Sequence, residues 1–77
     1  MIFSDNINEN DKRFIENLFI KGICKERFPI KGGTLVSIYE VEAYFYMLFT
    51  NCITCSITEI RKAEIREIEA YKKLYSR

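Results

Sequence analysis

The chain contains no histidine and no tryptophan, and its 77 residues include one proline and three glycines. Histidine is the commonest general base and metal-binding side chain near neutral pH, so its absence excludes most triad and acid–base chemistry. No G-x-S-x-G or G-x-x-x-x-G-K-[ST] motif occurs either, and the glycine run at 31–34 is better explained as a turn. We therefore expect a protein that is not an enzyme and that holds no cofactor.

Long apolar runs are also missing. The longest stretch without a formal charge covers 16 residues from Ala43 to Thr58, and polar side chains interrupt it. A helix that spans a bilayer needs about 20 mainly apolar residues. The N-terminal residues show no secretory signal, and an odd number of cysteines argues against a disulfide framework. The sequence therefore predicts a cytoplasmic protein with no membrane segment.

The composition is that of a folded domain, with 48% hydrophobic and 30% charged residues and a net charge of +1. A chain this short buries roughly 60% of its unfolded surface, which is enough for one small core. We find no linker and no internal repeat, so residues 1–77 are expected to form a single helical domain.

The first segment has the pattern of an amphipathic helix. Asn8 or Asn10 can cap its start, and apolar residues then recur at spacings of three and four, at Ile15, Leu18, Phe19 and Ile23. The following Phe28-Pro29 and Gly32-Gly33 pairs predict an extended stretch and a turn.

Two further segments also favour helices. Ser37 and Glu40 fit a capping box before an apolar run to about Thr50, although a short strand at 34–38 stays open. Ser56 and Glu59 fit a second capping box, and the helical period then runs to the C-terminus through Ile57, Ile60, Ile65, Ile68, Tyr71 and Tyr75. The expected fold is all-α: a small three-helix bundle, or a helical hairpin with an N-terminal helix.

The pair Cys52 and Cys55 forms a C-x-x-C motif. A thioredoxin-like site would need strands after the motif, and the remaining 22 residues are predicted to form one helix. A zinc site usually has four ligands, and Cys24 is the only further cysteine. We interpret both cysteines as structural and predict no metal site, while a metal-bound or redox role stays open.

The predicted middle helix is apolar nearly all round, whereas a helix in a small bundle needs one apolar stripe. Tyrosine and methionine on an uncovered helix face are typical of protein interfaces. The predicted partner-binding residues are Tyr39, Tyr44, Tyr46 and Met47.

A basic stretch offers a rival surface. Residues 21–31 include four basic residues and one acidic residue, Glu26, and such a cluster could contact nucleic acid or another anion. The residues concerned are Lys21, Lys25, Arg27 and Lys31.

The third segment, Ser56 to Tyr71, resembles the closing helical region of small bacteriophage tail or baseplate assembly chaperones, in which a capped helix follows an apolar one. The resemblance implies a phage-encoded protein in the host cytoplasm. We expect a small protein-binding protein that acts as an inhibitor or adaptor of a host or defence protein. Its partner would be another protein, from host or phage, or a second copy of itself. The alternatives are a phage assembly protein that self-associates and a nucleic-acid- or nucleotide-binding module that uses the basic 21–31 loop.

Overall fold

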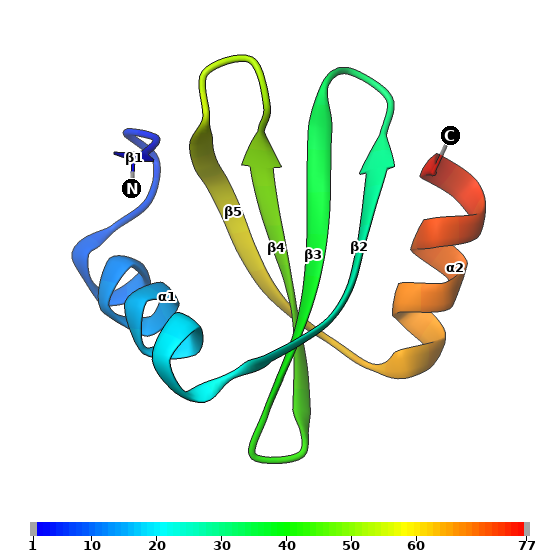
Figure 1. Cartoon of the computed structure of the whole chain (residues 1–77), viewed down its shortest axis with the longest axis horizontal. Coiled ribbons are helices and arrows are strands. Elements are labelled where there is room, and N and C mark those ends of the chain that lie inside the picture. The colour runs from blue at the N-terminus through cyan, green and yellow to red at the C-terminus, as the bar shows by residue number, and fades with distance from the viewer. Residues whose placement is uncertain (1, 77) are drawn as a thin grey trace.

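A five-stranded mixed sheet carries one helix on each face in the computed structural model, which describes residues 2–76 (Figure 1). The sheet order is β1-β5-β4-β3-β2; neighbouring strands from β2 to β5 are antiparallel, and β1 runs parallel to β5. The elements are β1 (Ile2–Phe3), α1 (Glu9–Lys21), β2 (Ile23–Ile30), β3 (Thr34–Val41), β4 (Tyr44–Asn51), β5 (Ser56–Ala63) and α2 (Ile65–Tyr75). The fold is α/β, and the prediction of an all-α helical bundle is wrong.

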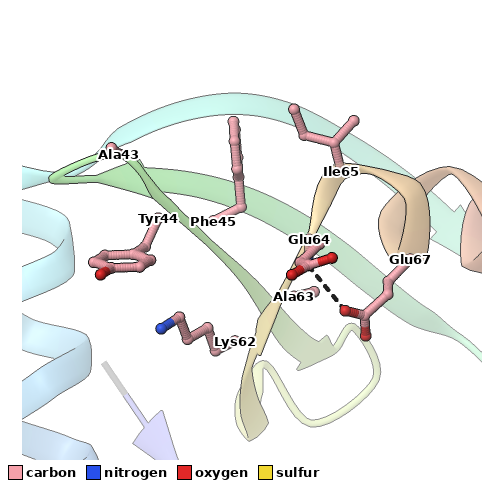
Figure 2. Close-up of a pocket in the computed structure, with 8 residues that line it drawn as sticks. All are labelled: Ala43, Tyr44, Phe45, Lys62, Ala63, Glu64, Ile65 and Glu67. Atoms are coloured by element: carbon pink, nitrogen blue, oxygen red, sulfur yellow. Dashed lines mark hydrogen bonds between the residues drawn. The ribbon is translucent and has the colours of Figure 1, made fainter.

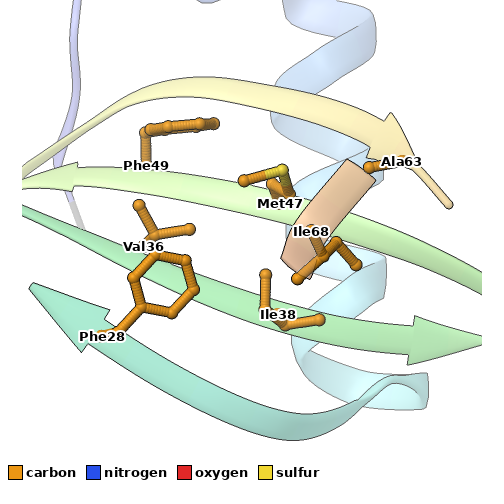
Figure 3. Packing of buried hydrophobic residues seen from close by; sticks show 7 residues of the cluster. All are labelled: Phe28, Val36, Ile38, Met47, Phe49, Ala63 and Ile68. Atoms are coloured by element: carbon orange, nitrogen blue, oxygen red, sulfur yellow. The ribbon is translucent and has the colours of Figure 1, made fainter. Parts of the chain in front are cut away.

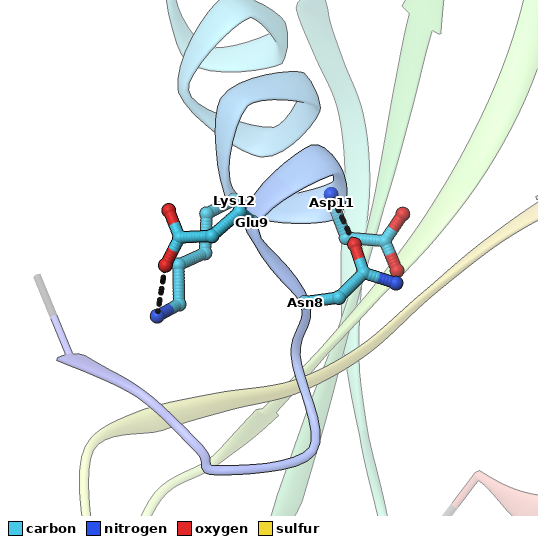
Figure 4. A network of polar contacts seen from close by, with 4 residues as sticks. All are labelled: Asn8, Glu9, Asp11 and Lys12. Carbon is cyan, nitrogen blue, oxygen red and sulfur yellow. Dashed lines mark hydrogen bonds and ion pairs between the residues drawn. The ribbon is translucent and has the colours of Figure 1, made fainter.

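The first helix agrees with its sequence pattern. The Asn8 side chain accepts a hydrogen bond from the Asp11 backbone N–H at 2.8 Å, and Lys12 pairs with Glu9 at 3.2 Å (Figure 4). Ile15 and Leu18 are buried, as the helical spacing indicates. Phe19 is exposed, and Ile23 lies beyond the helix as the first residue of β2, so the predicted stripe is correct for its first two residues only. The asparagine cap and the apolar stripe are therefore sufficient signals for α1.

The predicted middle helix is instead the hairpin of β3 and β4. Because a helix covers each face of the sheet, successive residues of these central strands are buried on alternate sides, and the apolar run shows no alternation. Ser37, predicted as a helix cap, is buried in β3 opposite Arg27 and Leu48. The strand left open at 34–38 is the first part of β3.

The predicted third helix is half strand and half helix. Ser56–Ala63 pairs with β4 as β5, and α2 covers Ile65–Tyr75 only. The capping box that starts this helix joins Glu64 and Glu67, not Ser56 and Glu59. The isoleucines at 57 and 60 reach the core from a strand, which is compatible with their β-branched shape.

The sheet separates two apolar cores. On the α1 side the buried residues are Ile7, Ile15, Leu18, Tyr39, Leu48 and Ile57. On the α2 side they are Phe28, Val36, Ile38, Met47, Phe49, Ala63 and Ile68 (Figure 3). Neither helix within residues 2–76 is long and apolar enough to cross a membrane.

Candidate binding site at the β3–β4 turn

The turn between β3 and β4 has an unusual backbone. Glu42 and Ala43 both lie at positive φ, 52° and 70°. Two-residue hairpin turns with positive φ at both positions strongly prefer Asn-Gly, because a Cβ atom is disfavoured in the left-handed region. The penalty is roughly 1 kcal/mol or more for each such residue. Strain of this kind concentrates at functional sites, so this end of the sheet is a candidate functional site.

An open cavity of about 540 Å³ lies beside this turn (Figure 2). It forms where β4 begins, β5 ends and α2 begins, so three elements and the strained turn meet around it. The lining residues are Ala43, Tyr44, Phe45, Lys62, Ala63, Glu64, Ile65 and Glu67.

The cavity combines an apolar lining with aromatic and charged groups. Tyr44 is 52% exposed and Ile65 60% exposed, although both are large apolar side chains. The Lys62 Nζ lies 3.8 Å from the centroid of the Tyr44 ring, which is a close cation–π contact. Phe45 points to the opposite face of the sheet from Tyr44, and Ile65 lies on the same side as Phe45 (Figure 2). The hollow can therefore accept an apolar group with a polar neighbour.

Carboxylates outnumber cations at the mouth of the cavity. Glu64 forms an ion pair with Arg66, whose Nε lies 3.4 Å from the carboxylate. Glu67 accepts a hydrogen bond from the Glu64 backbone N–H at 3.2 Å and has no cationic partner in the described part of the chain. The cavity lining itself has two carboxylates, Glu64 and Glu67, and one cation, Lys62. Glu42 of the adjacent turn is exposed and lines a separate, smaller hollow together with Lys21. The mouth therefore suits a ligand with a positive group beside its apolar part.

The structure does not bring the four predicted partner-binding residues together. Tyr39 is buried, with its ring centroid 5.6 Å from that of Phe19, and Tyr46 is half-buried, 4.8 Å from the ring of Phe14. Met47 is buried on the α2 side of the sheet, because neighbouring strand residues point to opposite faces. Of the four, Tyr44 alone lines the cavity.

Sequence reasoning missed the other seven lining residues, among them Phe45, Lys62 and Ile65. Their proximity depends on the end of β5 lying next to the start of β4, and the chain was expected to be helical in both places. The available signal was local: a two-residue gap, Glu42-Ala43, between two β-branched and aromatic runs.

The predicted basic contact residues do not form one patch either. Lys25 pairs with Glu40 at 3.5 Å, whereas Arg27 lies opposite Ser37 on the α1 side, where a hydrogen bond to Tyr39 raises the pKa of its guanidinium. Lys21 ends α1 next to the start of β2, and Lys31 lies beyond the other end of that strand. The four basic side chains are therefore not gathered on one surface that a nucleic acid could contact.

The three cysteines are free thiols on the surface. Cys52 and Cys55 lie in the β4–β5 loop, and the Cys55 thiol donates a weak hydrogen bond to the Cys52 carbonyl at 3.7 Å. Within residues 2–76 no group of three or more histidine, cysteine, aspartate or glutamate side chains could hold a metal ion.

Two groups with a shifted pKa lie on the α2 side of the sheet, outside the cavity. The ion pair and hydrogen bond with Glu26 raise the pKa of Lys72, and burial raises the pKa of Tyr71. Lys72 joins α2 to β2, and Tyr71 packs edge-on to Phe49. Both contacts fix α2 on the sheet, and so they hold Ile65 and Glu67 at the cavity.

Comparison with known proteins identifies no relative: no protein-family model matches the chain, and no curated protein or solved structure matches it.

Proposed function

We propose that this chain is a non-enzymatic protein-binding module, of the inhibitor or adaptor kind, whose partner occupies the cavity at the β3–β4 turn. The observation that carries the proposal is the cavity itself, with Tyr44 and Ile65 half or more exposed around it. Exposed large apolar side chains around a hollow are typical of partner-binding surfaces.

The strained turn supports the same location. Glu42 and Ala43 hold a backbone conformation that Asn-Gly would adopt at lower cost, and they place Tyr44 at the rim. A site that is built before its partner arrives loses less conformational entropy on binding. The turn and the Glu64–Glu67 capping box therefore support a preformed site.

The lining indicates the chemistry of the partner. A bulky aliphatic or aromatic side chain fits the surface of Phe45, Ala63 and Ile65. A lysine or arginine next to it would face the carboxylate of Glu67, which has no cationic partner among the described residues. We therefore propose a protein segment that offers an apolar side chain and a cation close together.

The test is affinity capture from a bacterial lysate with the wild-type chain and the Tyr44→Ala variant. We expect a protein bound by the wild type, whether foreign or an untagged copy of the chain, to be at least about tenfold depleted with Tyr44→Ala, because truncating a hot-spot aromatic side chain costs about 2 kcal/mol or more and about 1.4 kcal/mol is tenfold in affinity.

Tyr75→Ala is the matched control. Tyr75 is 49% exposed, close to the 52% of Tyr44, but it lies at the end of α2, outside the cavity. This variant should keep the bound protein. If Tyr44→Ala captured as much of the bound protein as the wild type, or if Tyr75→Ala lost as much of it as Tyr44→Ala, the cavity would not be the binding site.

A further inference from the structure

The end of the molecule opposite the cavity carries the most exposed large apolar side chain of the described residues. Ile53, 82% exposed, lies in the loop between β4 and β5. That loop and the β3–β4 turn lie at opposite ends of the sheet (Figure 1). One eight-residue strand separates them, roughly 25 Å at about 3.3 Å per residue. No chain can therefore place Ile53 in its own cavity.

The loop that carries Ile53 is held in place by its neighbours. The Asn51 Oδ1 accepts hydrogen bonds from the backbone N–H groups of Ile53 and Thr54, at 2.9 and 3.2 Å. The Cys52 N–H donates to the Gly33 carbonyl at 2.8 Å, which ties the loop to the β2–β3 turn. A Cβ atom on Gly33 would lie 3.3 Å from the Ile53 Cδ1, so the isoleucine rests against this glycine. Ile53 is thus a fixed protrusion.

The two ends also carry complementary charge. Lys31 lies in the β2–β3 turn beside Gly33, and neither 31–33 nor 52–55 contains an acidic residue. The cavity lining has two carboxylates, Glu64 and Glu67, against one cation, Lys62. One end thus offers an isoleucine and, in the turn against which it rests, a lysine. The other end offers an apolar hollow whose lining has one more carboxylate than cations. This is the combination that the cavity chemistry requires of its partner.

We infer that the partner is a second copy of this chain, and that the β4–β5 loop of one copy docks through Ile53 into the cavity of the next. The inference rests on the proposed function, because it names the occupant of the same cavity. The interface joins two different surfaces, so an open assembly of any length keeps a free loop at one end and a free cavity at the other, and either end can bind a further copy. Such head-to-tail contacts generate a ring or a filament.

The first measurement is the mass of the purified full-length chain by sedimentation velocity over a wide range of protein concentration. The wild type should exceed its monomer mass of 9.2 kDa increasingly as concentration rises. Ile53→Asp removes the protrusion and Ile65→Arg blocks the cavity, and each should weaken association at least about tenfold. Circular dichroism and melting curves establish that each variant is folded.

Mixing the two variants is the decisive step. Ile53→Asp keeps an intact cavity, and Ile65→Arg keeps an intact loop, so the mixture retains one functional interface per pair. It should give a species of two chains and nothing larger. A mixture that remains monomeric would contradict head-to-tail docking.

Ile20→Asp is the matched control, since Ile20 is 80% exposed but lies on α1. It should associate like the wild type. A wild type that stays monomeric at all concentrations, or an Ile53→Asp variant that associates normally, would overturn the inference. The proposed function would survive either result if Tyr44→Ala alone lost a foreign protein in the capture experiment, and would fail if Tyr44→Ala lost nothing.

Discussion

At the scale of single residues, the β3–β4 turn is the clearest conflict between sequence and conformation. A two-residue turn with positive φ at both positions is the usual role of Asn-Gly, and the chain places Glu42-Ala43 there. The chain does have glycines at positive φ, Gly32 and Gly33, in the preceding β2–β3 turn at the other end of the sheet. Glycine is therefore used in one hairpin turn and not in the other, although both have left-handed residues.

Replacing Ala43 with glycine should stabilise the protein. The left-handed conformation disfavours a Cβ atom, so Ala43→Gly should raise the free energy of unfolding by about 1 kcal/mol, measured by urea denaturation. The control is Ala70→Gly on the exposed surface of α2, where glycine should lower it by about 1 kcal/mol. The same substitution should thus change the free energy of unfolding in opposite directions at the two sites. A loss of stability at both would show that the turn is not strained.

At the scale of elements, α1 could be predicted and the sheet could not. Asn8, Ile15 and Leu18 act within one helix, so the local pattern contains the whole signal. The run 37–50 is ambiguous because the middle of β3 (36–39) and the middle of β4 (47–49) are buried on both faces, which erases the alternation that identifies a strand. The predicted capping boxes that begin at Ser37 and Ser56 lie in strands, since a serine and a glutamate three residues apart also occur there. The cavity was not predictable because it joins the start of β4 to the end of β5.

The start of α2 can be tested directly. The Glu67 carboxylate accepts a hydrogen bond from the Glu64 backbone N–H at 3.2 Å, so Glu67→Ala should lower the free energy of unfolding by about 1 kcal/mol. Glu69→Ala, at an exposed site within the helix, should change it by less than about 0.5 kcal/mol. Equal effects in thermal or urea unfolding would place the helix start elsewhere.

At the scale of the whole molecule, the two apolar cores pack against opposite faces of the same sheet. Ile15 of α1 is buried on one side and Ile68 of α2 on the other, and each anchors its helix to the central strands β3 and β4. Because Leu48 and Met47 are adjacent in β4 and face opposite cores, loss of either core exposes the strand that supports the other. The two layers should therefore unfold together, as small domains usually do.

Truncation of either anchor tests this coupling. Ile15→Ala and Ile68→Ala should each lower the free energy of unfolding by about 3 kcal/mol, since each removes buried methyl groups and leaves a cavity. Far-ultraviolet circular dichroism and tyrosine fluorescence should report one coincident urea transition in both variants. If a variant proves too unstable, the valine substitution at the same position removes one methylene, costs about 1 kcal/mol and preserves the comparison. Separate transitions for Ile68→Ala would mean that α2 detaches while the rest of the sheet stays folded, and the cavity that α2 helps to line would then open without global unfolding.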